Sequence, residues 1–267
     1  MSIFDYDFMK NAFIAILFIA PLFGILGTMV VNNRMAFFSD ALGHSAFTGI
    51  AIGILLGISD KDVSMVIFAI VFALLLNYIK HKNVASADTV ISVFSSLSVA
   101  VGLALLSRNG DFSRYSVMLV GDILNVTVSD IVKLAIALAV TIVVWFFFYN
   151  GLSGIGINKS IAKSKGIPVI LYENIFACLV AVVVMLTVRM AGILIINALL
   201  ILPAAAARNI SGNAREYHLF SCIGSIVSGL SGLVLSFYLD AAAGPMIAIV
   251  AAVLFFVTFA IREVGRK

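Results

Sequence analysis

The stretch that decides the fold is residues 35–58, MAFFSDALGHSAFTGIAIGILLGI. As a helix rising ~1.5 Å per residue it is long enough to cross the ~30 Å hydrocarbon core of a bilayer. Two of its residues, Asp40 and His44, are ionisable, and their spacing of four places them on one helical face. Ionisable side chains inside a span are costly and usually functional. The stretch therefore predicts a membrane helix that contains a polar site.

The rest of the chain has the composition of a membrane protein. Of its 267 residues, 63% are hydrophobic and 11% charged, and the mean hydropathy is +1.17, whereas soluble domains carry about 25% charged residues. We expect an all-α integral membrane protein with a single transmembrane domain over residues 1–267. Cys178 and Cys222 lie far apart in apolar segments, so neither a disulfide framework nor a thiolate metal site is expected.

Apolar stretches separated by short polar connections predict about eight to nine transmembrane helices. They fall near residues 11–31, 35–58, 62–79, 88–106, 131–149, 169–188, 190–207, 217–237 and 242–260. Residues 107–130 are the exception, because their apolar pieces are too short to cross. We expect a re-entrant segment near residues 116–125, whose irregular backbone must be buried in protein or line a wet cavity.

Basic residues in the short connections indicate the orientation. In a nine-span arrangement most of them share one side, namely Arg34, Lys80, Lys82, Lys159, Lys163, Lys165, Arg208, Arg215, Arg262, Arg266 and Lys267. Basic loops stay in the cytoplasm. The N-terminus is therefore expected outside the cell and the C-terminus in the cytoplasm.

The Asp40/His44 pair is expected to face a cavity, and the glycines of the same span to face another helix. His44 lies ~15 Å from the basic residue that precedes the span, near the middle of the bilayer. Gly49 and Gly53 point ~140° and ~180° away from His44, and with Gly57 they form a series that permits close helix packing. The alternative is that Asp40 caps the helix and His44 hydrogen-bonds a neighbouring helix.

A carboxylate and a neutral imidazole suit first-row divalent cations such as zinc. Asp40 and His44 form half of a four-ligand site, which a symmetric homodimer could complete. The ligand chemistry alone is compatible with zinc, manganese or iron. A site that passes a metal across the membrane must also release it, so the metal is expected to bind transiently, as substrate, with no permanently bound cofactor.

Two further polar residues are candidates for the pathway or a gate. Asp122 interrupts an apolar stretch near the expected outer face, and capping of a short helix is an equal alternative for it. Asn197 lies inside the 190–207 span, where a buried asparagine most often hydrogen-bonds between helices. A pathway role remains a hypothesis for both residues.

The connection from Gly156 to Pro168 is a candidate docking surface for a partner. Lys159, Lys163 and Lys165 flank a short segment that could be helical, and Gly166 is placed to end it. The alternative is a topology anchor, because any basic cytoplasmic loop satisfies the positive-inside rule.

Four segments resemble signature segments of one family, the membrane (permease) subunits of zinc/manganese-type ABC importers. In chain order they are RMAFFSDALGH (34–44), LVGDILNVT (119–127), AKSKGIP (162–168) and AGILIINALLILPAAAAR (191–208). Four such segments in the expected order form a specific signal. The departures are Gly43, where the family often has serine, and Thr48, where manganese-type members often have proline.

The resemblance implies a homodimeric permease in the cytoplasmic membrane of a bacterial cell. It implies that an extracytoplasmic binding protein delivers a divalent metal, that Asp40 and His44 contact it, and that an ATPase dimer docks at the loop containing Ala162. Local similarity, including residues 204–208, favours zinc. Since the chain lacks a Gly-x-x-x-x-Gly-Lys-[Ser/Thr] loop, it is expected to be no enzyme, with ATP hydrolysis in a separate partner. Nucleic acid is not an expected partner.

A proton- or sodium-coupled secondary transporter of metals or other cations is the alternative function, since it could also use an intramembrane Asp/His pair. Such folds often contain two related halves, and the sequence shows no convincing internal repeat. An intramembrane enzyme is disfavoured, because there is no His-Glu-x-x-His motif and Gly43-His44-Ser45 does not pair a nucleophile with a base.

Overall fold

A computed structural model of the chain describes residues 6–82, 85–108 and 121–265, and in these ranges it contains helices and no strands. The elements are α1 (Asp7–Asn32), α2 (Ala36–Leu55), α3 (Lys61–His81), α4 (Ala87–Arg108), η2 (Ile123–Asn125), α6 (Val128–Ile157), α7 (Lys159–Ser164), α8 (Val169–Ile210), α9 (Ala214–Tyr238) and α10 (Ala243–Gly265). Eight of these helices are long and apolar enough to cross a membrane. The expected all-α integral membrane fold is confirmed.

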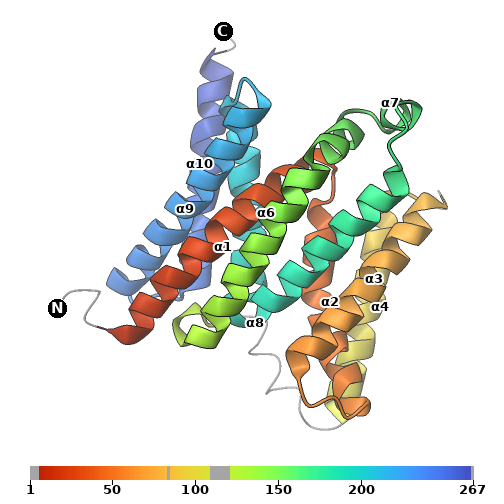
Figure 1. Cartoon of the computed structure of the whole chain (residues 1–267). Coiled ribbons are helices and arrows are strands. Elements are labelled where there is room, and N and C mark those ends of the chain that lie inside the picture. Colours follow the sequence, from red (N-terminus) through yellow and green to blue (C-terminus); the bar gives the residue numbers. More distant parts are fainter. Residues whose placement is uncertain (1–5, 83–84, 109–120, 266–267) are drawn as a thin grey trace.

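The long helices form one bundle, with short connections at its two ends (Figure 1). Helix α7 and the end of α10 lie at one end of the bundle, which we call the α7 end. Helix α1 begins at the opposite end and runs antiparallel to α9 (Figure 1). Two contacts fix this direction, since His218 in the first turns of α9 bonds Thr28 near the end of α1, and Phe237 at the end of α9 packs on Tyr6.

Helix α8 contains two of the expected spans. Its 42 residues would measure ~63 Å if straight, about twice the hydrocarbon thickness. The break is at Gly192, whose φ of 78° and ψ of 161° belong to a backbone region that is essentially restricted to glycine. The expected spans 169–188 and 190–207 therefore both lie in α8, which turns sharply between them at Gly192.

The two parts of α8 cross the bundle in opposite directions. The first part runs antiparallel to α3, because Glu173 contacts the end of α3 while Arg189 lies near Asp62 at its start. The second part runs alongside α10, from Ile195 near Gly244 to Asn209, which bonds Arg262. Gly192 thus lies at the end of the bundle opposite α7.

Close packing of α1 on α8 and α9 forms the centre of the molecule. A Cβ added at Gly27 would lie 2.0 Å from the carbonyl oxygen of Leu200, and one at Gly24 would lie 2.7 Å from Cα of Cys222. Ser221 of α9 also donates a hydrogen bond of 2.8 Å to the carbonyl of Gly24. Small residues and interhelical hydrogen bonds hold helices together in lipid, where apolar surface gains little from leaving the solvent.

Only part of the expected re-entrant segment 116–125 belongs to the described residues, because 116–120 lie outside them. Residues 121–127 are irregular apart from the single turn of η2, and Ile123 is buried. Gly121 has a φ of +65°, and its Cβ would lie 2.1 Å from the backbone nitrogen of Gly192. The irregular segment therefore packs directly against the break in α8.

Candidate metal-transport site and coupling segment

Asp40 and His44 lie one turn apart on α2, with Nε2 of His44 3.6 Å from Oδ1 of Asp40. At this distance the two side chains lie close together without a hydrogen bond. Met35 is the N-cap of α2, so Asp40, in the second turn, does not cap the helix. The capping alternative for Asp40 is therefore wrong.

Asn197 joins this pair from the second part of α8. Its Nδ2 donates a 2.6 Å hydrogen bond to Oδ1 of Asp40, one to two turns beyond the break at Gly192. The Oδ1 of Asn197 is buried and has no hydrogen-bond donor within the described part of the chain. An amide oxygen beside a carboxylate and an imidazole adds a third oxygen- or nitrogen-donor group of the kind that divalent metals accept.

One chain presents this site half open. The side chains of Asp40 and His44 are each 44% exposed, and Phe37 on the same face of α2 is exposed too. In residues 6–82, 85–108 and 121–265 there is no group of three or more His, Cys, Asp or Glu side chains that could hold a metal. Polar groups exposed within a span need protein or a wet cavity to cover them.

The glycines of α2 differ in what surrounds them. Gly49 and Gly53 lie against α3, since a Cβ at Gly49 would be 3.0 Å from Cα of Met65 and one at Gly53 only 2.2 Å from Oγ of Ser64. Gly57 is a correction to the expected packing series. It lies beyond the end of α2 with a φ of +68°, and its Cβ would meet nothing within 4 Å, so a left-handed turn explains this glycine.

Asp122 has only local hydrogen-bond partners in the described residues. It is the N-cap of η2, where Oδ1 accepts from the backbone nitrogen of Leu124 at 3.1 Å and Oδ2 from the side chain of Asn125 at 2.7 Å. This is the helix-cap alternative that the sequence left open. The structure does not bring Asp122 into contact with Asp40 or His44.

The Gly156–Pro168 connection contains the short helix α7. The side chain of Asn158 caps its start by accepting from the backbone of Ser160 and Ile161. At its end Gly166, with a φ of +78°, donates to the carbonyl of Lys163, and the next backbone nitrogen donates to the carbonyl of Ala162. This is a Schellman ending. It gives α7 a defined shape on a connection of few residues.

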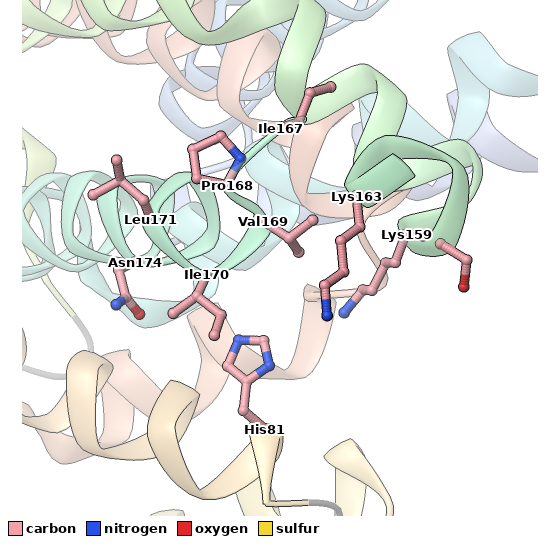
Figure 2. Close-up of a pocket in the computed structure, with 10 residues that line it drawn as sticks. His81, Lys159, Lys163, Ile167, Pro168, Val169, Ile170, Leu171 and Asn174 are labelled. Atoms are coloured by element: carbon pink, nitrogen blue, oxygen red, sulfur yellow. The ribbon is translucent and has the colours of Figure 1, made fainter. Parts of the chain in front are cut away.

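Residues of this connection differ in how far they are exposed to solvent. Ala162 is buried, whereas Lys163 and Lys165 are exposed. A cavity of about 680 Å³ separates α7 from the end of α3, and the side chains of Lys159 and Lys163 extend towards His81 across it (Figure 2). The segment thus presents basic side chains at the α7 end of the bundle.

Sequence reasoning missed two groups of charged residues. Glu173 is buried in the first turns of α8 beside Lys80, His81 and Lys159. Its position inside an apolar span was a usable signal, because a buried acid in a membrane needs partners. The second group lies at the opposite end, where Arg189 is 3.1 Å from Asp130 and 3.4 Å from Asp62, and Lys133 is 2.7 Å from Asp62. It ties α3, α6 and α8 together three residues before the break.

An ionisable pair inside one span of a multi-spanning helical bundle is typical of membrane transport proteins. The chain belongs to the ABC 3 transport family, whose model matches residues 5–262. The resemblance drawn from four short segments is confirmed by this match over nearly the whole chain.

Named relatives cover most of the chain. It is 32% identical over 242 residues to the high-affinity zinc uptake system membrane protein ZnuB of Haemophilus influenzae, covering 89% of this chain and 91% of that protein. It is 26% identical to the manganese import system permease protein ScaB of Streptococcus parasanguinis, covering 98% of this chain and 94% of that protein. Among solved structures, PsaBC from Streptococcus pneumoniae in complex with Fab has a TM-score of 0.83 and 26% identity, covering 95% of this chain and 91% of that chain.

A second solved structure supports the fold alone. It is an inward-facing conformation of a putative metal-chelate type ABC transporter, with 15% identity and a TM-score of 0.73, covering 96% of this chain and 86% of that chain. The bundle is therefore shared with a protein whose sequence has diverged widely from this one.

Proposed function

We propose that this chain is the permease subunit of an ABC importer that moves a divalent transition metal, zinc in the first place, into the cytoplasm of a bacterial cell. The observation that carries the proposal is the contact between Asp40, His44 and Asn197, three metal-compatible side chains inside a family of transport proteins. The names of relatives include both zinc and manganese systems, and an imidazole ligand favours zinc over harder cations.

In this proposal two copies of the chain complete the site. The open face of Asp40 and His44 is covered by the same face of a second copy, so that two carboxylates and two imidazoles surround one metal ion. An isologous dimer uses the same surface of both copies, and residues that lie at its two-fold axis face their own counterparts. The extracytoplasmic binding protein delivers the metal at the end of the bundle opposite α7.

The α7 end faces the cytoplasm and meets a partner ATPase dimer in this proposal. Lys159, Lys163 and Lys165 lie there, in agreement with the positive-inside rule, and so does the end of α10. Alternating access would then require the helices around Asp40 to rearrange when ATP is bound and hydrolysed. The break at Gly192 is placed to absorb such a rearrangement, because it lies five residues from Asn197.

The experiment that tests the function is metal uptake into liposomes containing the purified chain and its ATPase, with the metal supplied on its binding protein and uptake read with an internal zinc-sensitive dye. We expect uptake only when both the ATPase and ATP are present, and competition by unlabelled manganese or iron will rank the metals. Uptake driven by a proton or sodium gradient without ATPase would overturn the proposal in favour of a secondary transporter, which membership of the ABC 3 transport family does not favour.

A further inference from the structure

Glu173 is a buried acid that receives basic side chains from two other helices. Only 4% of the residue is exposed. Its Oε1 lies 2.6 Å from Nζ of Lys159 on α7 and 3.8 Å from Nζ of Lys80 on α3. Its Oε2 lies 2.8 Å from Nε2 of His81, in a charge contact that is not aligned as a hydrogen bond.

Because the carboxylate of Glu173 is buried, its stability depends on the placement of its basic partners. A carboxylate removed from water is stable only with well-placed partners, and removal of one partner leaves the others with an uncompensated charge. Lys159 is the nearest of the three bases and the one contributed by α7. The ion pair therefore fixes where α7 sits against the start of α8.

From Glu173 the first part of α8 leads straight to the break. The 19 residues from Glu173 to Gly192 correspond to ~28 Å of continuous helix. Immediately beyond the break, Asn197 donates its hydrogen bond to Asp40. Helix α8 thus connects the α7 end of the bundle with the candidate metal site.

We propose that Glu173 is a positioning residue that fastens α7 to α8, so that a displacement of α7 reaches the Asn197–Asp40 contact. This inference rests on the proposed function, since it assumes that the ATPase moves α7. Glu173 touches neither metal nor ATP. It acts by making α7 and the first part of α8 move as one body.

A second mechanical route exists through α6. Asn158 ends α6 and also caps α7, so α7 is joined to α6 by the chain itself. Neutralising Lys159 removes the ion pair with Glu173, and it leaves unchanged both the junction with α6 and the chain connection from α7 to α8 through residues 165–168. A loss of coupling in such a variant would therefore distinguish the Glu173 route from the α6 route.

The test measures metal ions transported per ATP hydrolysed in liposomes that contain the whole importer. The variants are Glu173→Gln, Lys159→Gln and the double variant, with Lys159→Arg as the conservative rescue. Lys82→Gln is the matched control, because Lys82 is an exposed lysine at the same end whose Nζ lies over the ring of Tyr78. Zinc binding and co-purification with the ATPase are measured for each variant.

We expect Glu173→Gln and Lys159→Gln each to lower the transport ratio at least tenfold, with zinc binding and assembly retained. The double variant should be no worse than either single one, since both remove the same contact. Lys159→Arg and Lys82→Gln should keep the ratio of the unmodified chain. A normal ratio in Lys159→Gln, multiplicative losses in the double variant, or an equal loss in Lys82→Gln would overturn the inference.

Two further comparisons separate a folding defect from a loss of coupling, and a failure of the proposed function from a failure of the role of Glu173. If Glu173→Gln does not fold, Lys159→Gln against Lys159→Arg decides alone, because both keep the buried acid. If the unmodified chain shows no ATP-dependent uptake, the proposed function itself fails. If it shows such uptake while Glu173→Gln and Lys159→Gln couple normally, only the role of Glu173 fails.

Discussion

Asp40 is held from two directions, by Asn197 at 2.6 Å and by His44 at 3.6 Å. Both contacts converge on the same carboxylate oxygen, so the second oxygen remains available for a ligand. The side chain is also 44% exposed. An oriented carboxylate with one open oxygen and an open face is suited to accept a metal and release it again.

The first prediction concerns this pair. Asp40→Ala and His44→Ala should each reduce metal uptake to background, because each removes two of the four ligands of the proposed dimeric site. Equilibrium dialysis of the unmodified chain should give one zinc per two chains. Ser39→Ala is the control, since this neighbouring hydroxyl donates its hydrogen bond to the carbonyl of Ala36 on the same helix. Normal uptake by both alanine variants of the pair would refute a direct role.

The second prediction concerns Asn197. A hydrogen bond to a charged group contributes about 1.5–3 kcal/mol, and Asn197→Ala removes one from Asp40. Zinc affinity measured by titration should fall by about tenfold or more, in line with that energy. Asn209→Ala is the matched control, because Asn209 lies on the same helix and bonds Thr258 and Arg262 instead. Equal affinities in the two variants would count against a role for Asn197 at the site.

At the scale of single elements, α2 separates two tasks between its faces. Asp40 and His44 lie on the open face, while Gly49 and Gly53 lie against α3, where Ser64 donates a 2.5 Å hydrogen bond to the carbonyl of Gly49. The glycines bring α3 close enough for that bond. Packing against α3 therefore fixes the orientation of α2 about its own axis. In this orientation Asp40 and His44 lie on the open face.

The third prediction compares two glycines. Gly53→Ala should lower the stability of the protein by about 1–3 kcal/mol, the usual cost of overpacking, because its Cβ would lie 2.2 Å from Oγ of Ser64. Gly154→Ala is the matched control, with its nearest contact at 3.7 Å, and should raise stability by about 0.4–1 kcal/mol through the unfolded state. Thermal unfolding in detergent measures both. Shifts of the same sign would show that the α2–α3 contact relaxes easily.

At the scale of the whole molecule, charge is concentrated at the two ends of an apolar bundle. Glu173 gathers basic groups at the α7 end, and Arg189 joins two acids at the opposite end. Both clusters include the first part of α8. This part of the helix is therefore anchored near each of its ends, and the break at Gly192, which packs against Gly121, follows three residues after Arg189.

The fourth prediction concerns the ATPase that is proposed to meet the α7 end of the bundle. Replacing Lys159, Lys163 and Lys165 together by glutamate should uncouple ATP hydrolysis from uptake while zinc binding persists, because the reversed charges oppose both docking and the contact with Glu173. Replacement of all three by arginine is the control. Intact coupling in the glutamate variant, with normal membrane insertion, would leave these lysines only a role in topology.

The sequence by itself determined the class of fold, the apolar spans, the Asp40/His44 pair and the helical segment before Gly166. These features are local, since a bilayer requires each span to satisfy its own backbone hydrogen bonds and makes every ionisable residue conspicuous. Only the tertiary structure decided that Asn197 meets Asp40 across 157 residues of sequence, that Glu173 meets bases on α3 and α7, and that Gly192 turns one helix into two crossings. Such pairings depend on the rotation and depth of each helix, which close packing sets and which hydropathy does not contain.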